Sequence, residues 1–209
     1  MPTTNTIHAD GIAEVVMDNP PVNALTVAGW FGLADTLIEL GRDPQVRAVV
    51  LRAEGRGFNA GVDIKEMQAS DGFDALIGAN RGCYAAFAAV YDCPVPVIAA
   101  VNGFCLGGGI GLVGNADVIV AADDATFGLP EVDRGALGAA THLSRLVPQQ
   151  KMRAMVYTSA TATAQELQHY GSVHAVVPQA DLREAAFDVA RQIAAKSCLL
   201  YTSPSPRDS

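Results

Sequence analysis

Three short segments of almost unbroken apolar sequence most constrain the fold of this chain. They are RAVVLRA at 47–53, VIAAV at 97–101 and DVIVAA at 117–122, and each runs into a loop that contains glycine or aspartate. A strand that helices cover on both faces loses the alternation of a half-exposed strand and becomes continuously apolar. We therefore expect these segments to form neighbouring strands at the centre of a largely parallel sheet.

Helical segments alternate with these strands. Residues 27–40 carry apolar side chains at helical spacing, as does the later segment that contains Leu76, Cys83, Phe87 and Val90. Strands that alternate with helices are typical of an α/β fold. The sequence thus predicts an α/β domain with a largely parallel sheet.

The same pattern extends toward both ends of the chain. A strand is expected at 12–18, ahead of the first helix. Thr163 with Glu166 and Asp181 with Glu184 have the spacing of helix capping boxes, with the short strand AVV between them. The last residues, 197–209, show no periodicity and end in a cluster of proline and serine.

These features predict one domain over residues 1–196, followed by a disordered tail at 197–209 that looks unrelated to the rest. The chain has 209 residues, of which 50% are hydrophobic, enough for a sizeable core. We interpret the abrupt change at the tail as a truncation with a non-native end.

Charge and composition exclude several classes of partner. The chain has 14 basic and 22 acidic residues, a net charge of −8, with no basic block that would favour nucleic acid. No apolar run of 18 residues predicts a membrane span, and the first residues do not resemble a signal peptide. The four cysteines lack metal-type or redox-type spacing. We expect a cytoplasmic protein with reduced thiols, no metal and no membrane partner.

The glycines at 102–117, NGFCLGGGIGLVGNAD, pose the functional question. Gly109, Gly111 and Gly114 form a GxGxxG pattern, which in dinucleotide-binding folds lies directly after the first strand. Here residues 102–106 intervene, and two strands precede the pattern. A lone GxGxxG is weak evidence. A nucleotide-binding oxidoreductase is therefore the least favoured alternative.

A second glycine loop, EGRGFNAGVDIKEM at 54–67, also follows a buried strand. Loops at the carboxyl ends of neighbouring parallel strands face one crevice. Each loop could direct one backbone N–H at a single oxygen, which is the arrangement of an oxyanion hole. Alternatively, both are tight turns that need glycine only for backbone geometry.

Together the motifs FNAGVDIKEM, PVIAAVNGFCLGGGIGL and ADVIVAADDATFGLPEVDRGALG resemble the crotonase (enoyl-CoA hydratase/isomerase) superfamily, over about residues 10 to 196. The resemblance implies a ClpP-like spiral of repeated ββα units and an acyl-CoA substrate, with CoA as part of the substrate and no separate cofactor. It also implies homotrimers or hexamers in full-length relatives. Their C-terminal helical segment is missing here, so we expect a weak trimer and low activity for this chain.

The resemblance also assigns site residues. The N–H groups of Val62 and Gly108 would hold the thioester oxygen, and Glu131 would be the catalytic carboxylate. The residues expected to bind CoA are Ala60, Asp63 and Ile64 at the adenine, with Arg56 and Lys65 near the phosphates. Further candidates are Asp133 and His142 for catalysis, with Arg134 and Asn115 as contacts of a polar acyl group.

Hydratases of the family carry a first catalytic glutamate at the position that is Gly111 here. The resemblance therefore favours a hydratase function less. Ala139 stands where dienoyl-CoA isomerases carry an aspartate. The motifs are most similar to the actinobacterial branch that hydrolyses a carbon–carbon bond in a bicyclic diketo CoA thioester from steroids, and the missing glutamate would leave room for a bulkier acyl group. The alternatives are an enoyl-CoA isomerase or one-glutamate hydratase, and an inactive CoA-binding scaffold.

Overall fold

A computed structural model describes residues 3–134 and 138–196 and contains a six-stranded sheet in the order β1-β2-β3-β4-β6-β9. The strands are β1 (Thr3–Ile7), β2 (Ile12–Met17), β3 (Ala48–Ala53), β4 (Val97–Val101), β6 (Val118–Ala122) and β9 (Ala175–Val177). Only β1 is antiparallel to its neighbour; every other pair is parallel. The predicted central strands and their parallel pairing are confirmed.

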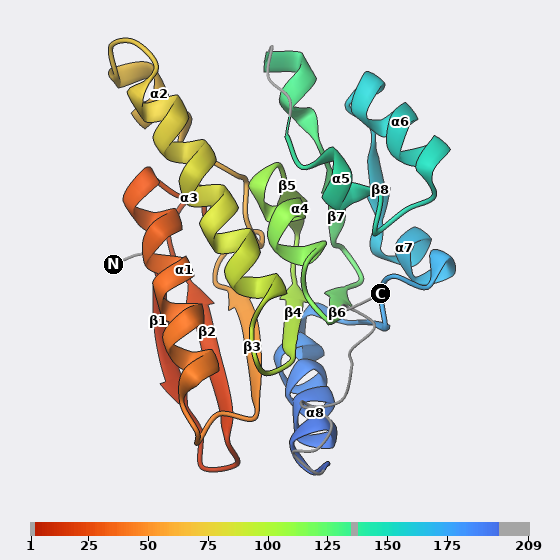
Figure 1. Ribbon diagram of the computed structural model, residues 1–209. Coiled ribbons are helices and arrows are strands. Elements are labelled where there is room, and N and C mark those ends of the chain that lie inside the picture. The colour runs from red at the N-terminus through yellow and green to blue at the C-terminus, as the bar shows by residue number, and fades with distance from the viewer. Residues whose placement is uncertain (1–2, 135–137, 197–209) are drawn as a thin grey trace.

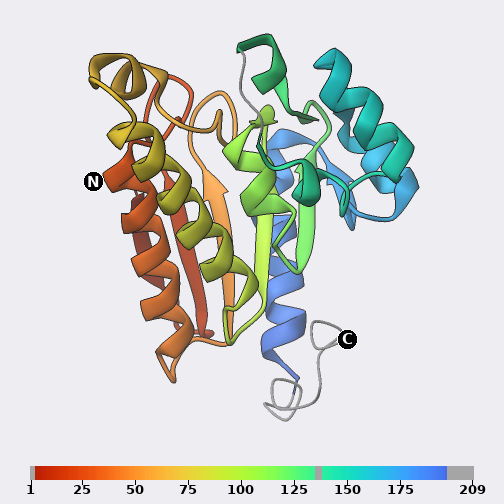
Figure 2. The same ribbon diagram turned by 45° about the horizontal axis from the view of Figure 1, so that its top comes forward.

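Helices cover both faces of this sheet (Figures 1 and 2). On one face lie α1 (Val27–Arg42) and α3 (Asp74–Tyr91), and α8 (Leu182–Ala194) packs on the other. The remaining helices are α2 (Ile64–Ala69), α4 (Gly108–Val113), α5 (Ala140–Leu143), α6 (Gln149–Thr158), α7 (Ala164–Tyr170) and the 3-10 helices η1 (Pro130–Arg134) and η2 (Gln179–Asp181). None of the helices in the described ranges is long and apolar enough to cross a membrane.

A second, three-stranded sheet lies beside the first and sets the spiral character of the fold. It consists of β5 (Phe104–Leu106), β7 (Thr126–Gly128) and β8 (Thr161–Thr163). The chain passes from β4 to β5 and then into α4, and likewise from β6 to β7 and then into η1. This repeat matches the expected ββα units. The sequence predicted the three-residue strand β9 but none of the three strands of this second sheet, which are too short to leave a periodic signal.

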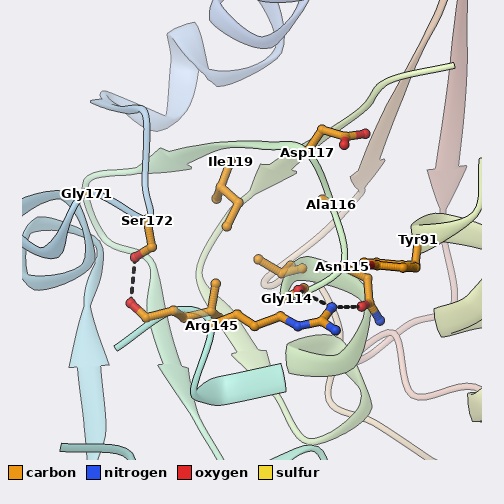
Figure 3. Close-up of a pocket in the computed structure, with 11 residues that line it drawn as sticks. Tyr91, Gly114, Asn115, Ala116, Asp117, Ile119, Arg145, Gly171 and Ser172 are labelled. Atoms are coloured by element: carbon orange, nitrogen blue, oxygen red, sulfur yellow. Dashed lines mark hydrogen bonds between the residues drawn. The ribbon is translucent and has the colours of Figure 1, made fainter. Parts of the chain in front are cut away.

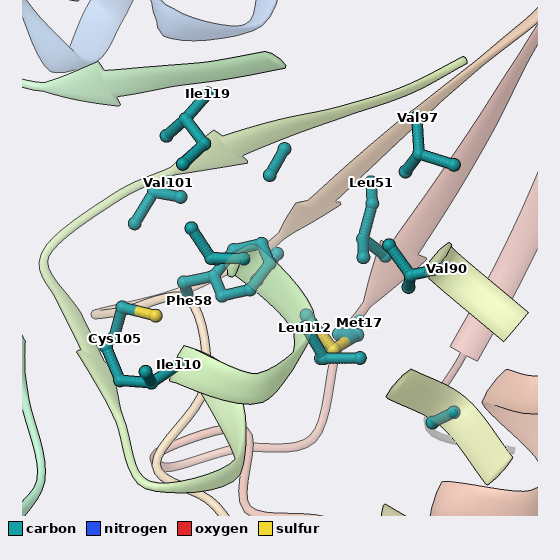
Figure 4. Close-up of a cluster of buried hydrophobic side chains, with 14 of the residues drawn as sticks. Met17, Leu51, Phe58, Val90, Val97, Val101, Cys105, Ile110, Leu112 and Ile119 are labelled. Carbon is teal, nitrogen blue, oxygen red and sulfur yellow. The ribbon is translucent and has the colours of Figure 1, made fainter. Parts of the chain in front are cut away.

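The core beneath α4 joins these units. Figure 4 shows Phe58, Cys105, Ile110 and Leu112 packed together with side chains from the sheet, and all four are fully buried. The loop after β3, strand β5 and helix α4 therefore share one core. Because that core is dense, the turns at its edge are held firmly in place.

Two details differ from the sequence predictions, and a third stays untested. The capping box of Thr163 and Glu166 is confirmed at α7, but Asp181 precedes α8 without a side-chain cap hydrogen bond. Leu76, expected at an apolar position of α3, is 59% exposed, and the buried residues of this helix begin at Ala79. The predicted tail at 197–209 lies outside the described residues, so the boundary at 196 stays a prediction.

A buried carboxylate fastens α8 to the sheet. Glu14 on β2 is only 6% exposed and accepts hydrogen bonds from His8, Arg52 and Arg183, the last through Nε at 2.7 Å and Nη2 at 2.8 Å. The hydrogen bonds from Arg183, followed by those from Arg52 and His8, outweigh burial and lower the pKa of Glu14 from 4.5 to about 2. A carboxylate with a depressed pKa stabilises the fold above its unfolded value, and this contribution disappears as the pH falls toward 2.

Glu14→Gln is therefore expected to flatten the acid limb of the stability curve. The wild type should lose about 3 kcal/mol of unfolding free energy from this group between pH 4.5 and pH 2, and the variant should not. Urea unfolding across that range measures the difference. Glu54→Gln removes an exposed partner of Arg52 and should change the stability by less than about 1 kcal/mol. Parallel acid limbs for wild type and Glu14→Gln would contradict this prediction.

Candidate active site

Two glycine turns meet at the carboxyl end of the central strands. Gly61 lies in the loop after β3 with φ +90°, and Gly107 lies directly before α4 with φ +58°. A Cβ on Gly61 would stand 3.1 Å from the Gly108 nitrogen, tighter than an ordinary van der Waals contact. The two loops expected to share a crevice do lie side by side, and glycine permits the approach.

Each turn leaves one backbone N–H without a carbonyl partner among the described residues. In the first, Leu25 N donates to Gly61 O and Asp63 N donates to Leu25 O, both at 2.9 Å, which bypasses the N–H of Val62. In the second, Gly108 is the first residue of α4, where the helix itself supplies no acceptor. Neither the Val62 nor the Gly108 N–H donates a hydrogen bond within the described part of the chain. Both are available to an oxygen atom of a ligand.

Glu131 brings a carboxylate to the second turn. It lies in η1, and a Cβ on Gly107 would be only 2.7 Å from its Oε1. Its Oε2 is buried and finds no hydrogen-bond partner in the described residues. Burial raises the pKa of Glu131 above its ordinary value, opposed by a hydrogen bond to its own backbone. A carboxylate with a raised pKa holds a proton more strongly, as a general base at neutral pH should.

The glycines of α4 admit neighbouring groups at close range. A Cβ on Gly108 would lie 2.7 Å from the Trp30 ring, one on Gly111 would lie 2.1 Å from Phe87 Cζ, and one on Gly114 would lie 2.7 Å from the His142 carbonyl oxygen. These three glycines recur every third residue, so they line one face of the helix. Of the GxGxxG glycines, Gly111 and Gly114 belong to this face, and a Cβ on Gly109 would lie 2.8 Å from the Asn59 carbonyl oxygen. Packing therefore accounts for the pattern, which removes the reason to expect a nucleotide there. The space beside Gly111 is occupied by Phe87, so the expectation that a missing glutamate leaves room there is wrong.

His142 and Asp133 differ in their surroundings. The His142 ring lies 5.1 Å from the Phe87 ring, and its Nδ1 is buried without a partner among the described residues. Burial, with a smaller contribution from Arg145, lowers the pKa of His142 and keeps the imidazole neutral near pH 7. Asp133 is exposed, although it belongs to the same short helix as Glu131.

The two residues proposed as acyl contacts are not both found near the oxyanion turns. Asn115 lies beyond the last turn of α4, where it donates to Gly111 O at 2.9 Å and accepts from Arg145. This is the opposite end of α4 from Gly108, so Asn115 fixes the helix end. The side chain of Arg134 lies outside the described part of the structure.

The residues expected to bind CoA surround the first turn. Asp63 caps α2 by accepting from the backbone N–H groups of Lys65 at 2.8 Å and Glu66 at 3.3 Å. Ile64 and Lys65 are exposed in the first turn of α2, and Ala60 is half-buried. Arg56 is exposed and donates through Nε to Pro21 O at 3.4 Å. Basic and apolar side chains are thus accessible beside the turn.

A cavity among the described residues lies elsewhere. It has a volume of about 540 Å³ and lies at the carboxyl end of α4, where Tyr91, Asn115, Arg145 and Ser172 are among the residues that line it (Figure 3). The guanidinium of Arg145 stacks on Tyr91 at 5.0 Å from the ring centroid and donates to Gly114 O at 3.2 Å. Because α4 separates this cavity from Gly108, we do not assign the thioester to it.

Gly111→Ala is expected to destabilise the fold because the added methyl group would overlap the Phe87 ring. Overpacking of this kind costs about 1–3 kcal/mol of unfolding free energy. Thermal or urea unfolding measures it. Gly32→Ala is a matched control, since it also adds a methyl group to a helix but meets nothing within 4 Å. Equal stability of the Gly111 variant and wild type would show that the helix face is not packed this tightly.

Comparison with known proteins identifies the family. The sequence profile described as enoyl-CoA hydratase/isomerase matches residues 8–203. The chain belongs to the enoyl-CoA hydratase/isomerase family. This agrees with the glycine turns and with the ββα units, and it confirms the resemblance stated from the motifs. The oligomeric state and the absence of a metal or separate cofactor stay predictions.

Two relatives within this family are each 68% identical to the chain over 196 residues, or 94% of its length. One comes from Rhodococcus jostii and is covered to 76%, and the other comes from Mycobacterium tuberculosis and is covered to 79%. Both are named (7aS)-7a-methyl-1,5-dioxo-2,3,5,6,7,7a-hexahydro-1H-indene-carboxyl-CoA hydrolase. A carnitinyl-CoA dehydratase of Salmonella typhi is 34% identical over 186 residues, covering 87% of this chain and 70% of its own.

Solved structures of the family share the fold. Human enoyl coenzyme A hydratase domain-containing protein 3 superposes with a TM-score of 0.90 at 31% identity, covering 97% of this chain and 81% of its own. An enoyl-CoA hydratase from Mycobacterium smegmatis gives a TM-score of 0.91 at 29% identity, with 96% and 79% covered. The predicted crotonase fold is confirmed.

Proposed function

We propose that this chain is a CoA-thioester hydrolase that opens a ring of a bicyclic diketo acyl group by cleaving a carbon–carbon bond. The observation that carries the proposal is the 68% identity to two hydrolases whose name describes a dioxo hexahydroindene carried on CoA. Hexahydroindene is a fused pair of rings, and such skeletons remain from steroid breakdown. The site geometry supports the same chemistry.

In this proposal, the thioester oxygen accepts hydrogen bonds from the N–H groups of Val62 and Gly108. Their two turns are packed against each other, so the donors are already positioned before the substrate binds. Preorganised donors stabilise the negative charge that develops on the oxygen, at no cost of reorganisation during the reaction. The CoA portion then lies along the exposed residues Arg56, Ile64 and Lys65.

Glu131 supplies the proton transfers. The carboxylate accepts a proton from a water molecule as the oxygen of that water bonds to the carbon of a ring ketone. The bond from that carbon to the ring carbon conjugated with the thioester then breaks, and its electron pair enters the thioester enolate. Glu131 returns the proton to the enolate carbon. One ring becomes a free carboxylic acid, and water is the only other reactant.

The environment of Gly111 favours hydrolysis over hydration. Two carboxylates divide the acid and base roles when water adds across a double bond. Here the position of the first carboxylate is a glycine, and the Phe87 ring fills the space beside it. An enoyl-CoA isomerase needs a single carboxylate, so it remains the second candidate function.

Purified chain should convert the bicyclic diketo CoA thioester to a ring-opened acid, with one oxygen from solvent water in the new carboxylate. Incubation in H₂¹⁸O followed by mass spectrometry measures this incorporation. Crotonyl-CoA hydration should be at least about 100-fold slower than ring opening, since one of the two carboxylates that hydration uses is missing. Rapid crotonyl-CoA hydration without ring opening would refute the hydrolase assignment. Double-bond migration alone would favour the isomerase.

A further inference from the structure

Three aromatic side chains form a row along the glycine face of α4. The Trp30 and Phe87 ring centroids are 5.8 Å apart at 85°, and those of Phe87 and His142 are 5.1 Å apart at 63°. Edge-to-face contacts at these distances are favourable for aromatic rings. The row begins against Gly108, a proposed oxyanion donor, and continues past Gly111. It therefore borders the place where the reacting acyl group begins.

The members of the row are buried to different degrees. Trp30 is fully buried and packs closely against Gly82, since a Cβ on Gly82 would come within 2.8 Å of the Trp30 Cβ. Phe87, on α3, is only half-buried although the tip of its ring lies against Gly111. Because its neighbours hold the ring edge, the accessible part of Phe87 is a positioned apolar surface.

The two rings that contact Phe87 each carry a nitrogen without a hydrogen-bond partner in the described ranges. These atoms are Nε1 of Trp30 and Nδ1 of His142, both buried. Buried polar atoms in native proteins are nearly always hydrogen-bonded, so a missing partner calls for an explanation. An apolar ring beside two rings with unmatched nitrogens suits a ligand with an apolar body and oxygen substituents.

We propose that Phe87 is a specificity-determining residue of the thioester site, whose ring receives the fused-ring body of the acyl group and fills the place that a carboxylate at residue 111 would need. The inference rests on the proposed function for the identity of that acyl group. It predicts a preference for cyclic over short linear acyl groups, because a ring buries more apolar surface against Phe87 than a short chain does.

Binding of two unreactive probes tests the preference without turnover. Calorimetry with cyclohexanecarboxyl-CoA and butyryl-CoA should show that the wild type binds the cyclic probe about 10-fold more tightly or better. Phe87→Ala should bind the two probes with nearly equal affinity, so that the ratio of their affinities (the probe ratio) falls toward one. Tyr84→Ala, one helical turn earlier on α3 with Tyr84 74% exposed, should keep it. An unchanged ratio in Phe87→Ala would overturn the proposal.

Phe87→Leu covers the case in which Phe87→Ala does not fold. It keeps apolar volume but loses the flat ring, and it should reduce the probe ratio several-fold while retaining a cooperative thermal transition. An intact ratio in Phe87→Leu overturns the proposal as well. If the wild type fails to open the bicyclic thioester but its probe ratio depends on Phe87, the proposed function is wrong and this inference stands.

A second experiment tests whether the Phe87 ring blocks a carboxylate at residue 111. Gly111→Glu combined with Phe87→Ala should hydrate crotonyl-CoA at least about 10-fold faster than Gly111→Glu alone, because the new carboxylate then has space and one positioned acid or base is worth that much. Equal hydration by two well-folded variants would contradict the claim that the ring blocks this position.

Discussion

Replacing Glu131 with glutamine is expected to lower kcat of ring opening by about 10²- to 10⁴-fold, the usual contribution of a positioned general base. Glutamine keeps the shape of the side chain but cannot accept the proton from water. CoA-thioester binding should change little, because the proposed thioester contacts are the backbone N–H groups of Val62 and Gly108. Steady-state kinetics and a binding titration on the same samples separate the two effects.

The same substitution should not weaken the fold. Burial raises the pKa of Glu131, which means that the folded state disfavours its charged form. Above its unfolded pKa, the carboxylate therefore lowers stability, and a neutral glutamine removes this penalty. The melting temperature should stay equal or rise.

In the wild type, kcat/KM should fall as the pH drops through the raised pKa of Glu131, because the protonated carboxyl group cannot act as the base. Full turnover by Glu131→Gln would exclude Glu131 as the base.

Gly107→Ala is expected to reduce kcat by about 100-fold or more, because a displacement of 1 Å in a catalytic group can cost that much. The new methyl group would stand 2.7 Å from Glu131 Oε1, so the carboxylate must move. Gly107 also has φ +58°, which costs an alanine about 1–2 kcal/mol. Activity and unfolding free energy must therefore be measured together.

Gly171→Ala separates the two consequences of that change. Gly171 has φ +85°, so alanine meets the same backbone strain, but nothing lies within 4 Å of its Cβ position. This variant should lose stability comparably and keep its kcat within about 3-fold, since small shifts remote from the site leave the reacting geometry intact. If both variants lose activity equally, the contact between Gly107 and Glu131 is not what matters.

The order of elements could be predicted from the sequence because it depends on local patterns. The apolar runs at 97–101 and 118–122 are typical of strands buried on both faces, and helical segments between strands favour the parallel pairing that β4 and β6 show. The motif around Gly108 and Glu131 likewise identified the family. Each of these signals lies within a few consecutive residues.

The environment of each residue depended instead on segments distant in the sequence. Phe87 meets Gly111 across 24 positions, and Glu14 meets Arg183 across 169. No periodicity encodes such contacts, since they arise when helices and strands pack. The sequence alone therefore determined that position 111 carries no carboxylate and that Glu131 remains. Only the tertiary structure decided what fills the vacated place, because that depends on which side chain of α3 packs against α4.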